Sequence, residues 1–239
     1  MDKKTLGILG GMGPAASAHF YTLLTQLTKA ERDFEHMKII LCSAPNIPDR
    51  TEYILRNSAD NPLHEMEQAA KTLVRAGAEL IAVPCNTAEY FHTDLQKLCP
   101  VPILRTVHET CAYAAASGVQ KLGIMATNGT VKAEIYQKEL LAFGMDFAIP
   151  SEHEQNLLHN IIYNGIKKAR CFEKSVFFAV AEELRSQGCD AIALGCTELS
   201  LISLSEKARD YNFIDSLEVL AKRSIQLCGY ELRENKDKK

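Results

Sequence analysis

The chain has 239 residues, of which 46% are hydrophobic and 24% are charged, and its formal net charge is −3. This composition is that of an ordinary globular protein, and it excludes the disordered, collagen-like and coiled-coil classes. A chain of this length can bury roughly 70–75% of its unfolded surface, so a hydrophobic core can stabilise it without disulfides. Lysine and arginine are spread along the chain, and without a basic stripe we do not expect nucleic acid as a partner.

The N-terminal residues and the lengths of the apolar runs predict the cellular compartment, which in turn bears on the cysteines. Only five residues follow Lys4 before Gly10, which is too short for the apolar part of a signal peptide, and no apolar run approaches the ~18 residues of a membrane span. We therefore expect a cytoplasmic protein without a membrane partner. Thiols stay reduced there, so the eight cysteines are not a disulfide framework. No two of them form Cys-x-x-Cys, and we predict no metal site.

The order of the predicted elements is typical of the α/β class. Short apolar runs alternate with longer segments of helical period, which favours parallel sheets covered by helices. In chain order, strands are predicted at residues 5–9, 37–42, 80–83, 103–104, 121–125, 146–149 and 191–194. Helices are predicted to begin at Pro14, which suits the first helical position, and near residues 61, 88, 106, 130, 152, 173 and 216.

The chain also contains an internal repeat. Residues 6–9 (LGIL) recur as 122–125 (LGIM), and residues 77–87 recur as 188–198, each time with a cysteine eight positions after a glycine. We therefore predict two pseudo-symmetric α/β domains, each a parallel sheet flanked by helices, with the active-site cleft between them. The predicted domains are residues 1–104 and 105–211, and a C-terminal helix of about residues 212–239 is expected to pack back onto the first.

Two of the cysteines, Cys85 and Cys196, follow predicted strands at equivalent points of the repeat. Ligands bind beyond the carboxyl ends of parallel strands, and the N-terminus of a following helix would stabilise a thiolate. If the domains face each other, one sulfur lies on each wall of the cleft. Inversion at a tetrahedral carbon needs an acid and a base on opposite faces, and a thiol of pKa ~8.5 lowered toward 7 can serve as both.

Removal of a proton from a Cα–H group leaves a carbanion, so donors must surround its carboxylate. The candidate donors are Asn86, Thr87, Thr197 and the adjoining backbone amides. No cofactor is needed for this chemistry. The other six cysteines are interpreted as core packing. They are Cys42, Cys99, Cys111, Cys171, Cys189 and Cys228.

Two rival interpretations stay open at this point. Residues 11–16 match the dinucleotide fingerprint weakly, but Cys42-Ser43-Ala44 stands where that fingerprint expects an acidic residue. The glycines are better explained by a tight turn that lets a substrate approach the backbone near Met12. A non-enzymatic small-ligand-binding protein would also have two βα domains around a cleft, although it would not require paired cysteines.

Four motifs carry a resemblance to a known family: residues 7–14 (GILGGMGP), 46–51 (NIPDRT), 84–88 (PCNTA) and 195–198 (GCTE). Together they resemble the aspartate racemase branch of the aspartate/glutamate racemase family, over nearly the whole chain from Leu6 to about Cys228. The resemblance implies a homodimeric, cofactor-independent amino-acid racemase that acts on aspartate, possibly glutamate. It also implies that Cys85 and Cys196 are the proton donor and acceptor.

The resemblance further implies which residues contact the substrate. Arg50 would hold a substrate carboxylate. Lys167 would be the second basic contact, unless the neighbouring Lys168 takes that place. A guanidinium group for one carboxylate and a second cation for the other suit a dicarboxylic acid. The region of the α-carboxylate is assigned to Asn86, Thr87 and Ala88. The remaining predicted substrate contacts are Met12, Thr197 and Glu198.

The chain departs from the glutamate racemases of the family at two positions. Gly10 stands where they have an aspartate, and Glu198 stands where they have a histidine. Both departures point away from the glutamate-specific branch, and the presence of both cysteines favours racemisation over decarboxylation. A glutamate racemase, a racemase of broad specificity, and a hydantoin or maleate isomerase-like enzyme remain as alternatives.

Overall fold

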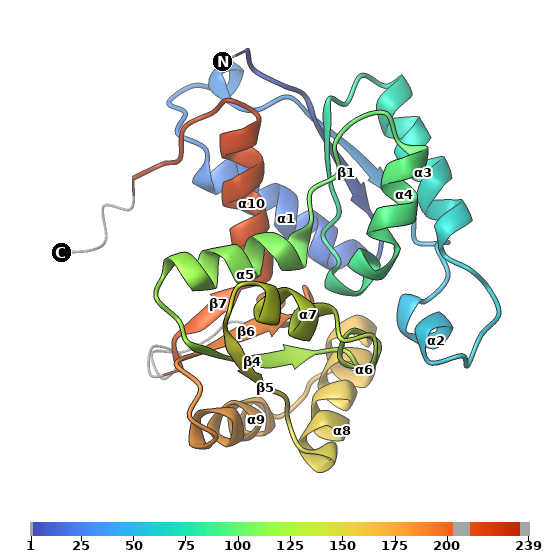
Figure 1. The fold of residues 1–239 in the computed structure, drawn as a ribbon. Helices are drawn as coiled ribbons and strands as arrows, with labels where there is room; N and C mark the ends of the chain where they lie inside the picture. The colour runs from blue at the N-terminus through green and yellow to red at the C-terminus, as the bar shows by residue number, and fades with distance from the viewer. Residues whose placement is uncertain (1, 203–210, 235–239) are drawn as a thin grey trace.

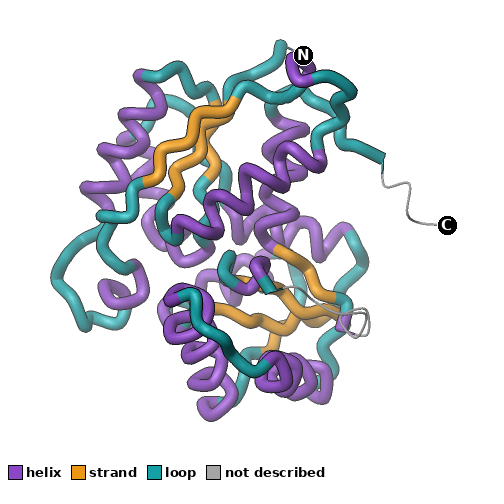
Figure 2. The backbone as a smooth tube through the Cα atoms, turned by 180° about the vertical axis from the view of Figure 1, so that it is seen from behind, coloured by secondary structure: helices purple, strands orange, loops and turns teal. Residues whose placement is uncertain are grey.

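Two parallel sheets organise the computed structural model, which describes residues 2–202 and 211–234. The N-terminal sheet has the order β2-β1-β3, and the C-terminal sheet has the order β5-β4-β6-β7. Figure 2 shows them as two separate groups of strands. The strands are β1 (Leu6–Gly10), β2 (Ile39–Ser43), β3 (Leu80–Ala82), β4 (Lys121–Ala126), β5 (Asp146–Ala148), β6 (Ala191–Gly195) and β7 (Phe213–Asp215).

The internal repeat of the sequence corresponds to a strand arrangement that occurs in both sheets. In one sheet β1 lies between β2 and β3, and in the other β4 lies between β5 and β6, with every pairing parallel. The predicted α/β class with two helix-flanked parallel sheets is therefore confirmed. The predicted boundary between residues 104 and 105 falls in the loop before α5 (Thr106–Ala116), and as a domain boundary it stays a prediction.

The helices connect the strands and cover the sheets (Figure 1). Pro14 occupies the first turn of α1, as predicted. No helix among the described residues has the length and apolar character that crossing a membrane requires. The other α-helices are α2 (Arg50–Ile54), α3 (Leu63–Arg75), α4 (His92–Leu98), α6 (Asn128–Lys132), α7 (Ile135–Ala142), α8 (Glu152–Asn160), α9 (Lys174–Ser186) and α10 (Ser216–Leu227), while α1 spans Pro14–Leu27.

Shorter helical segments lie close to the functional residues discussed below. The segments η2 (Asn86–Phe91), η4 (Ile166–Lys168) and η5 (Leu199–Leu201) are 3-10 helices, and η3 (Ile161–Gly165) is a π-helix. A further 3-10 turn, η1, spans Asp33–Glu35.

Three local expectations differ from the structure. The strand predicted at residues 103–104 is a single parallel bridge between Ile103 and Ile81, because Pro102 has no backbone N–H with which to extend the ladder. The short elements β7 and α2 were not predicted, since three to five residues carry too little periodicity. Cys171 is exposed, so its interpretation as core packing is wrong.

The core of the N-terminal half has two layers, one on each face of its sheet. All five residues of β1 are buried, as in parallel strands that are covered on both faces. Leu9 packs with Met66 and Leu73 of α3 on one face. On the other face, Leu6 and Ile8 pack against side chains of α1 and α10.

Helix α10 joins the two halves of the molecule. It follows β7 directly, and the Asp215 carboxylate caps its N-terminus by accepting a hydrogen bond from the Leu217 amide at 2.8 Å. The helix then runs beside α1 in the N-terminal half (Figure 1), where Leu220 and Ile225 lie in the same cluster as Phe20. Residues near both ends of the described chain thus lie in one half, and the middle of the chain builds the other.

Replacement of Leu220 by alanine tests this packing. Leu220 is fully buried, and removal of a buried leucine side chain costs about 2–5 kcal/mol, so we expect Leu220→Ala to lower the free energy of unfolding by that amount in urea denaturation. Leu141→Ala on α7, where the side chain is 63% exposed, is the matched control and should change stability by less than about 0.5 kcal/mol. Equal effects of the two substitutions would contradict the described role of α10.

Candidate active site

A small cavity lies where the carboxyl ends of both sheets meet. Residues from both halves of the chain line it, which fits the rule that parallel sheets bind ligands beyond the carboxyl ends of their strands. All the predicted site residues except Ala88 contribute to its wall. They are Met12, Arg50, Cys85, Asn86, Thr87, Lys167, Cys196, Thr197 and Glu198.

Ala88 lies outside this cavity. It is buried and lines a separate, mostly apolar cavity behind Cys85, together with Val83 and Leu95. Its amide already donates a hydrogen bond to the Cys85 carbonyl at 3.2 Å. The Ala88 amide is therefore not available to a substrate carboxylate in this conformation, and the position of Ala88 differs from the expected one.

Four further residues line the cavity that the sequence analysis missed: Asp49, Thr51, Thr127 and Tyr163. Asp49 and Thr51 flank Arg50 in the NIPDRT motif, so the motif itself was a signal. Thr127 follows β4 just as Gly11 and Met12 follow β1, and the internal repeat could have identified it. Tyr163 lies one helical turn before Lys167 and carried no signal of its own.

The two cysteines reach the cavity from different sheets. Cys85 lies three residues beyond β3 and Cys196 follows β6 directly, and both side chains are largely buried. A helix N-terminus was expected behind each sulfur. Cys85 is instead followed by the 3-10 helix η2, and Cys196 is followed by a turn in which the Leu199 amide donates to the Cys196 carbonyl at 2.9 Å.

The surroundings of Cys196 favour the thiol. Its Sγ donates a hydrogen bond to Oε2 of Glu198 at 3.1 Å. Burial, and then the Glu198 carboxylate, raise the pKa of Cys196 well above its ordinary value, while the Lys167 cation acts in the opposite direction. The expectation that a helix terminus lowers the pKa of this thiol is therefore wrong.

A guanidinium group, that of Arg50, lies in the wall of the cavity near Cys85. Arg50 is 7% exposed, and its Nη2 donates to the Met12 carbonyl at 2.9 Å while its Nη1 donates to the Pro48 carbonyl at 3.0 Å. Burial alone would lower the pKa of Arg50, but the Cys85 sulfur and the Asp49 carboxylate outweigh burial and raise it. The charged neighbours of the two cysteines therefore differ, because Arg50 acts on Cys85 whereas both Glu198 and Lys167 act on Cys196.

Lys167 and its neighbour Lys168 have different environments. The Nζ atom of Lys167 lies 3.6 Å from Oδ2 of Asp49 and 4.0 Å from the centre of the Tyr163 ring. Lys168 instead donates to Oδ1 of Asn164 at 2.8 Å on the surface. Burial would lower the pKa of Lys167, but the Glu198 carboxylate and other neighbours raise it. Of the two lysines, Lys167 is the one that faces the cavity.

The side chains of Asn86 and Thr87 hold the two halves together. The Asn86 amide donates to Oγ of Ser216 at 2.9 Å, and its carbonyl accepts from the Tyr136 hydroxyl at 2.7 Å. The Thr87 hydroxyl lies 2.9 Å from the hydroxyl groups of both Thr127 and Thr130. These side chains were predicted to surround the substrate, but much of their hydrogen-bonding capacity is used by protein partners.

Two glycines allow the loops of the site to approach closely. Gly11 has a φ of +95°, and a Cβ there would collide with the Ala44 backbone, so the turn after β1 needs glycine. A Cβ at Gly129 would lie 2.8 Å from the Thr51 Cα, and this close approach packs α2 against α6 across the two halves. Met12 and Thr127 are thereby placed in one wall.

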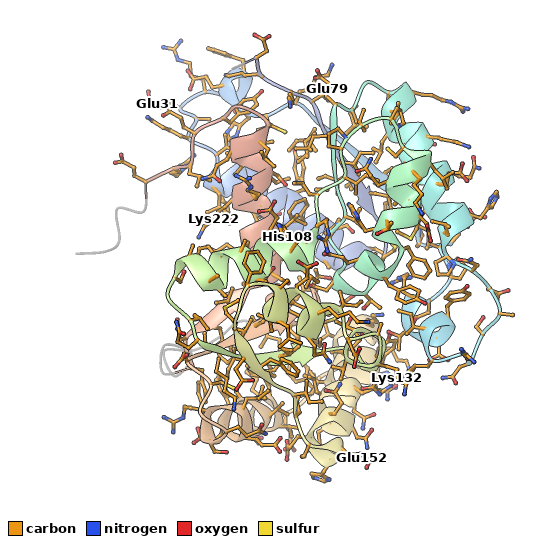
Figure 3. The ribbon with its side chains drawn as sticks, in the orientation of Figure 1. Glu31, Glu79, His108, Lys132, Glu152 and Lys222 are labelled. Atoms are coloured by element: carbon orange, nitrogen blue, oxygen red, sulfur yellow. The ribbon has the colours of Figure 1, made fainter. Side chains whose placement is uncertain are left out.

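Glu89 anchors the segment that follows Cys85. Its carboxylate accepts hydrogen bonds from the amides of Val107 at 2.6 Å and His108 at 3.2 Å at the start of α5. Figure 3 shows His108 on α5, between the two halves of the molecule. Burial raises the pKa of Glu89 to about 7, although both amides and Arg105 act to lower it.

This pKa predicts a pH dependence of stability. The pKa of Glu89 in the folded protein is about 7, above the ordinary value of 4.5, so the folded state holds this proton more tightly than the unfolded state does. The contribution of Glu89 to the free energy of unfolding is therefore complete below about pH 4.5 and is lost as the pH rises through about 7. The free energy of unfolding in urea should therefore fall between pH 5 and pH 8, and by less in Glu89→Gln. Glu31→Gln, on the surface in Figure 3, controls for the loss of one negative charge. An unchanged pH dependence in Glu89→Gln would contradict this role.

The site holds no arrangement typical of a metal centre. Within residues 2–202 and 211–234, no group of three or more His, Cys, Asp or Glu side chains is placed to hold a metal ion.

Comparisons with known proteins point to one family. A family model described as Asp/Glu/Hydantoin racemase matches residues 9–223. The broad specificity amino-acid racemase RacX of Bacillus subtilis strain 168 is 28% identical over 228 residues, covering 92% of this chain and 96% of that protein. Among solved structures, the aspartate racemase of Picrophilus torridus is 30% identical with a TM-score of 0.82, and 96% of each chain is covered. An aspartate racemase homologue from Pyrococcus horikoshii OT3 is 25% identical with a TM-score of 0.76, covering 94% of this chain and 99% of that one.

Proposed function

Because the chain belongs to the Asp/Glu/Hydantoin racemase family, we propose that it is a cofactor-independent amino-acid racemase that interconverts L- and D-aspartate. One observation carries the proposal. Cys85 from one sheet and Cys196 from the other line a single cavity, so an acid and a base are available in its two walls. The aspartate racemase of Picrophilus torridus supports aspartate as the substrate, since it is similar over 96% of the chain.

The proposed reaction moves one proton at each sulfur. The thiolate of one cysteine removes the Cα proton, and the electron pair of the C–H bond remains on the substrate as a carbanion delocalised into its carboxylate. The thiol of the other cysteine then gives its proton to the opposite face of Cα and becomes a thiolate. The product has inverted configuration, and the two cysteines have exchanged protonation states.

The neighbours of the cysteines suggest which one starts in which state. Cys85 shares the cavity wall with the Arg50 cation, whereas the Cys196 thiol donates a hydrogen bond to the Glu198 carboxylate. We infer that Cys196 begins the cycle as the thiol that gives its proton to Cα, because the Glu198 carboxylate holds the protonated form. After one turnover Cys196 is left without that proton.

The two cations of the cavity support a dicarboxylic substrate. Arg50 keeps its Nε–H without a hydrogen-bond partner, so it can donate to one carboxylate, and Lys167 can pair with the other. Each contact would also stabilise negative charge that develops on the substrate carboxylate during proton removal.

A racemase of broader specificity is the second candidate. The Nζ atom of Lys167 already lies 3.6 Å from the Asp49 carboxylate, which offsets part of its positive charge. A second substrate carboxylate would therefore be attracted less strongly than by an unpaired lysine. The similarity to the broad specificity racemase RacX points in the same direction. The homodimer and the cytoplasmic location that the sequence implied stay predictions.

Incubation with L-aspartate in heavy water tests the two-thiol mechanism. Without added cofactor, the protein should yield D-aspartate that carries deuterium at Cα. Cys85→Ser and Cys196→Ser should each lower racemisation by about 10²–10⁴-fold, because a serine hydroxyl is a poor proton donor and acceptor here. Exchange with one enantiomer can survive in each variant, since one thiol remains.

The exposed Cys171 offers a matched control, and Cys171→Ser should racemise like the unmodified protein. If both Cys85→Ser and Cys196→Ser racemise normally, the mechanism is wrong. If neither aspartate nor glutamate is racemised or exchanged, the assignment to acidic amino acids is wrong.

The two adjacent lysines separate aspartate from broad specificity. If Lys167 binds the side-chain carboxylate, Lys167→Met should lower kcat/KM for aspartate by about 10–100-fold and change kcat/KM for alanine far less. Lys168→Met is the control and should change neither, because Lys168 contacts Asn164 on the surface. Equal losses for aspartate and alanine would show that Lys167 does not recognise the side chain.

A further inference from the structure

The two carboxylate oxygens of Glu198 have different surroundings. Oε2 accepts hydrogen bonds from the Cys196 thiol at 3.1 Å and from the Thr197 hydroxyl at 3.3 Å. Oε1 is equally buried but has no hydrogen-bond partner. The residue as a whole is only 4% exposed. Because a buried carboxylate oxygen without a donor is unfavourable, Oε1 is a position where a ligand can supply what the protein does not.

Glu198 lies at the border of the cysteine cavity and a wider one, since it lines both. A Cβ at Gly13, which lines the wider cavity, would lie 3.0 Å from Oε1. The absence of a side chain at Gly13 therefore leaves room beside this oxygen.

A complementary unpaired group lies in the same walls. Nε of Arg50 is a buried donor without a partner, and Arg50 also lines both cavities. The site thus presents one unmatched donor on a cation and one unmatched acceptor on an anion. A molecule with one carboxylate and one ammonium group matches both, whereas a molecule with carboxylates alone leaves Glu198 unmatched.

We propose that Oε1 of Glu198 binds the α-ammonium group of the substrate, so that the site selects free α-amino acids over N-acyl amino acids and hydantoins. This inference rests on the proposed racemase function and narrows its substrate class. A charged ammonium suits a buried carboxylate better than a neutral amide N–H, because charge-assisted hydrogen bonds are roughly twice as strong as neutral ones.

The same carboxylate then couples substrate binding to Cys196. Glu198 is one of the groups that raise the pKa of the Cys196 thiol, second only to burial. An ammonium group on Oε1 offsets the negative charge next to the sulfur. The thiol therefore becomes a better proton donor when a substrate with a free amino group is present.

The test compares ligands that differ only in the amino group. Calorimetry measures binding of aspartate and of succinate, which is aspartate without its amino group, and of glutamate and glutarate as a second pair. The unmodified protein should bind at least one amino acid about 10-fold or more tightly than its partner diacid. N-carbamoyl-aspartate and the corresponding hydantoin should bind no better than succinate.

Glu198→Gln provides the matched variant. It should weaken binding of the amino acid by about 10–100-fold and leave binding of the diacid within about threefold, because glutamine keeps the shape but not the charge of Glu198. Glu231→Gln is the control. It removes an exposed carboxylate that pairs with Lys29, and it should change neither the binding of the amino acid nor that of the diacid. Thermal unfolding of each variant shows whether it is folded.

The outcomes separate this inference from the proposed function. If the unmodified protein binds diacids as tightly as amino acids, or if folded Glu198→Gln keeps the preference for the amino group, the inference is overturned. The comparison within the unmodified protein decides the matter even if Glu198→Gln does not fold. A protein that prefers amino acids through Glu198 but does not racemise them would overturn the proposed function alone.

Discussion

The contact between the two halves of the chain is the constraint on which the site depends. Buried hydroxyl groups of Thr87, Thr127 and Thr130 meet there, and Asn86 bridges Tyr136 and Ser216. Buried polar groups are costly unless each finds its partner, so these bonds fix how one sheet faces the other. The cavity that contains both cysteines exists only in that arrangement.

Within this cavity, symmetry of fold is combined with asymmetry of charge. The two sheets repeat one topology, and each supplies a cysteine just beyond a strand. The side chains next to the cysteines differ, however, because Arg50 lies near Cys85 while Glu198 accepts a hydrogen bond from the Cys196 thiol. The proposed racemisation needs one base and one acid at the start, and we expect this difference between the two sulfurs to separate those roles.

Much of the fold was predictable, and the failures have local causes. The strands from β1 to β6 are mostly apolar, and their positions were expected within a few residues. The segment at residues 103–104 failed as a strand because Pro102 cannot donate to a neighbour, and β7 was missed because three residues show no period. Ala88 was expected at the substrate, but its amide is used within the 3-10 turn after Cys85.

The sequence by itself determined the α/β class and the internal repeat, and it singled out Cys85 and Cys196 as candidates among eight cysteines, because periodicity and motif spacing are local properties of the chain. Only the tertiary structure decided that Lys167 rather than Lys168 faces the cavity, that Asp49 and Tyr163 belong to its wall, and that Asn86 and Thr87 serve the contact between halves. It also reversed the expected shift in the pKa of Cys196, since burial and the charge of Glu198 depend on which groups surround the sulfur in three dimensions.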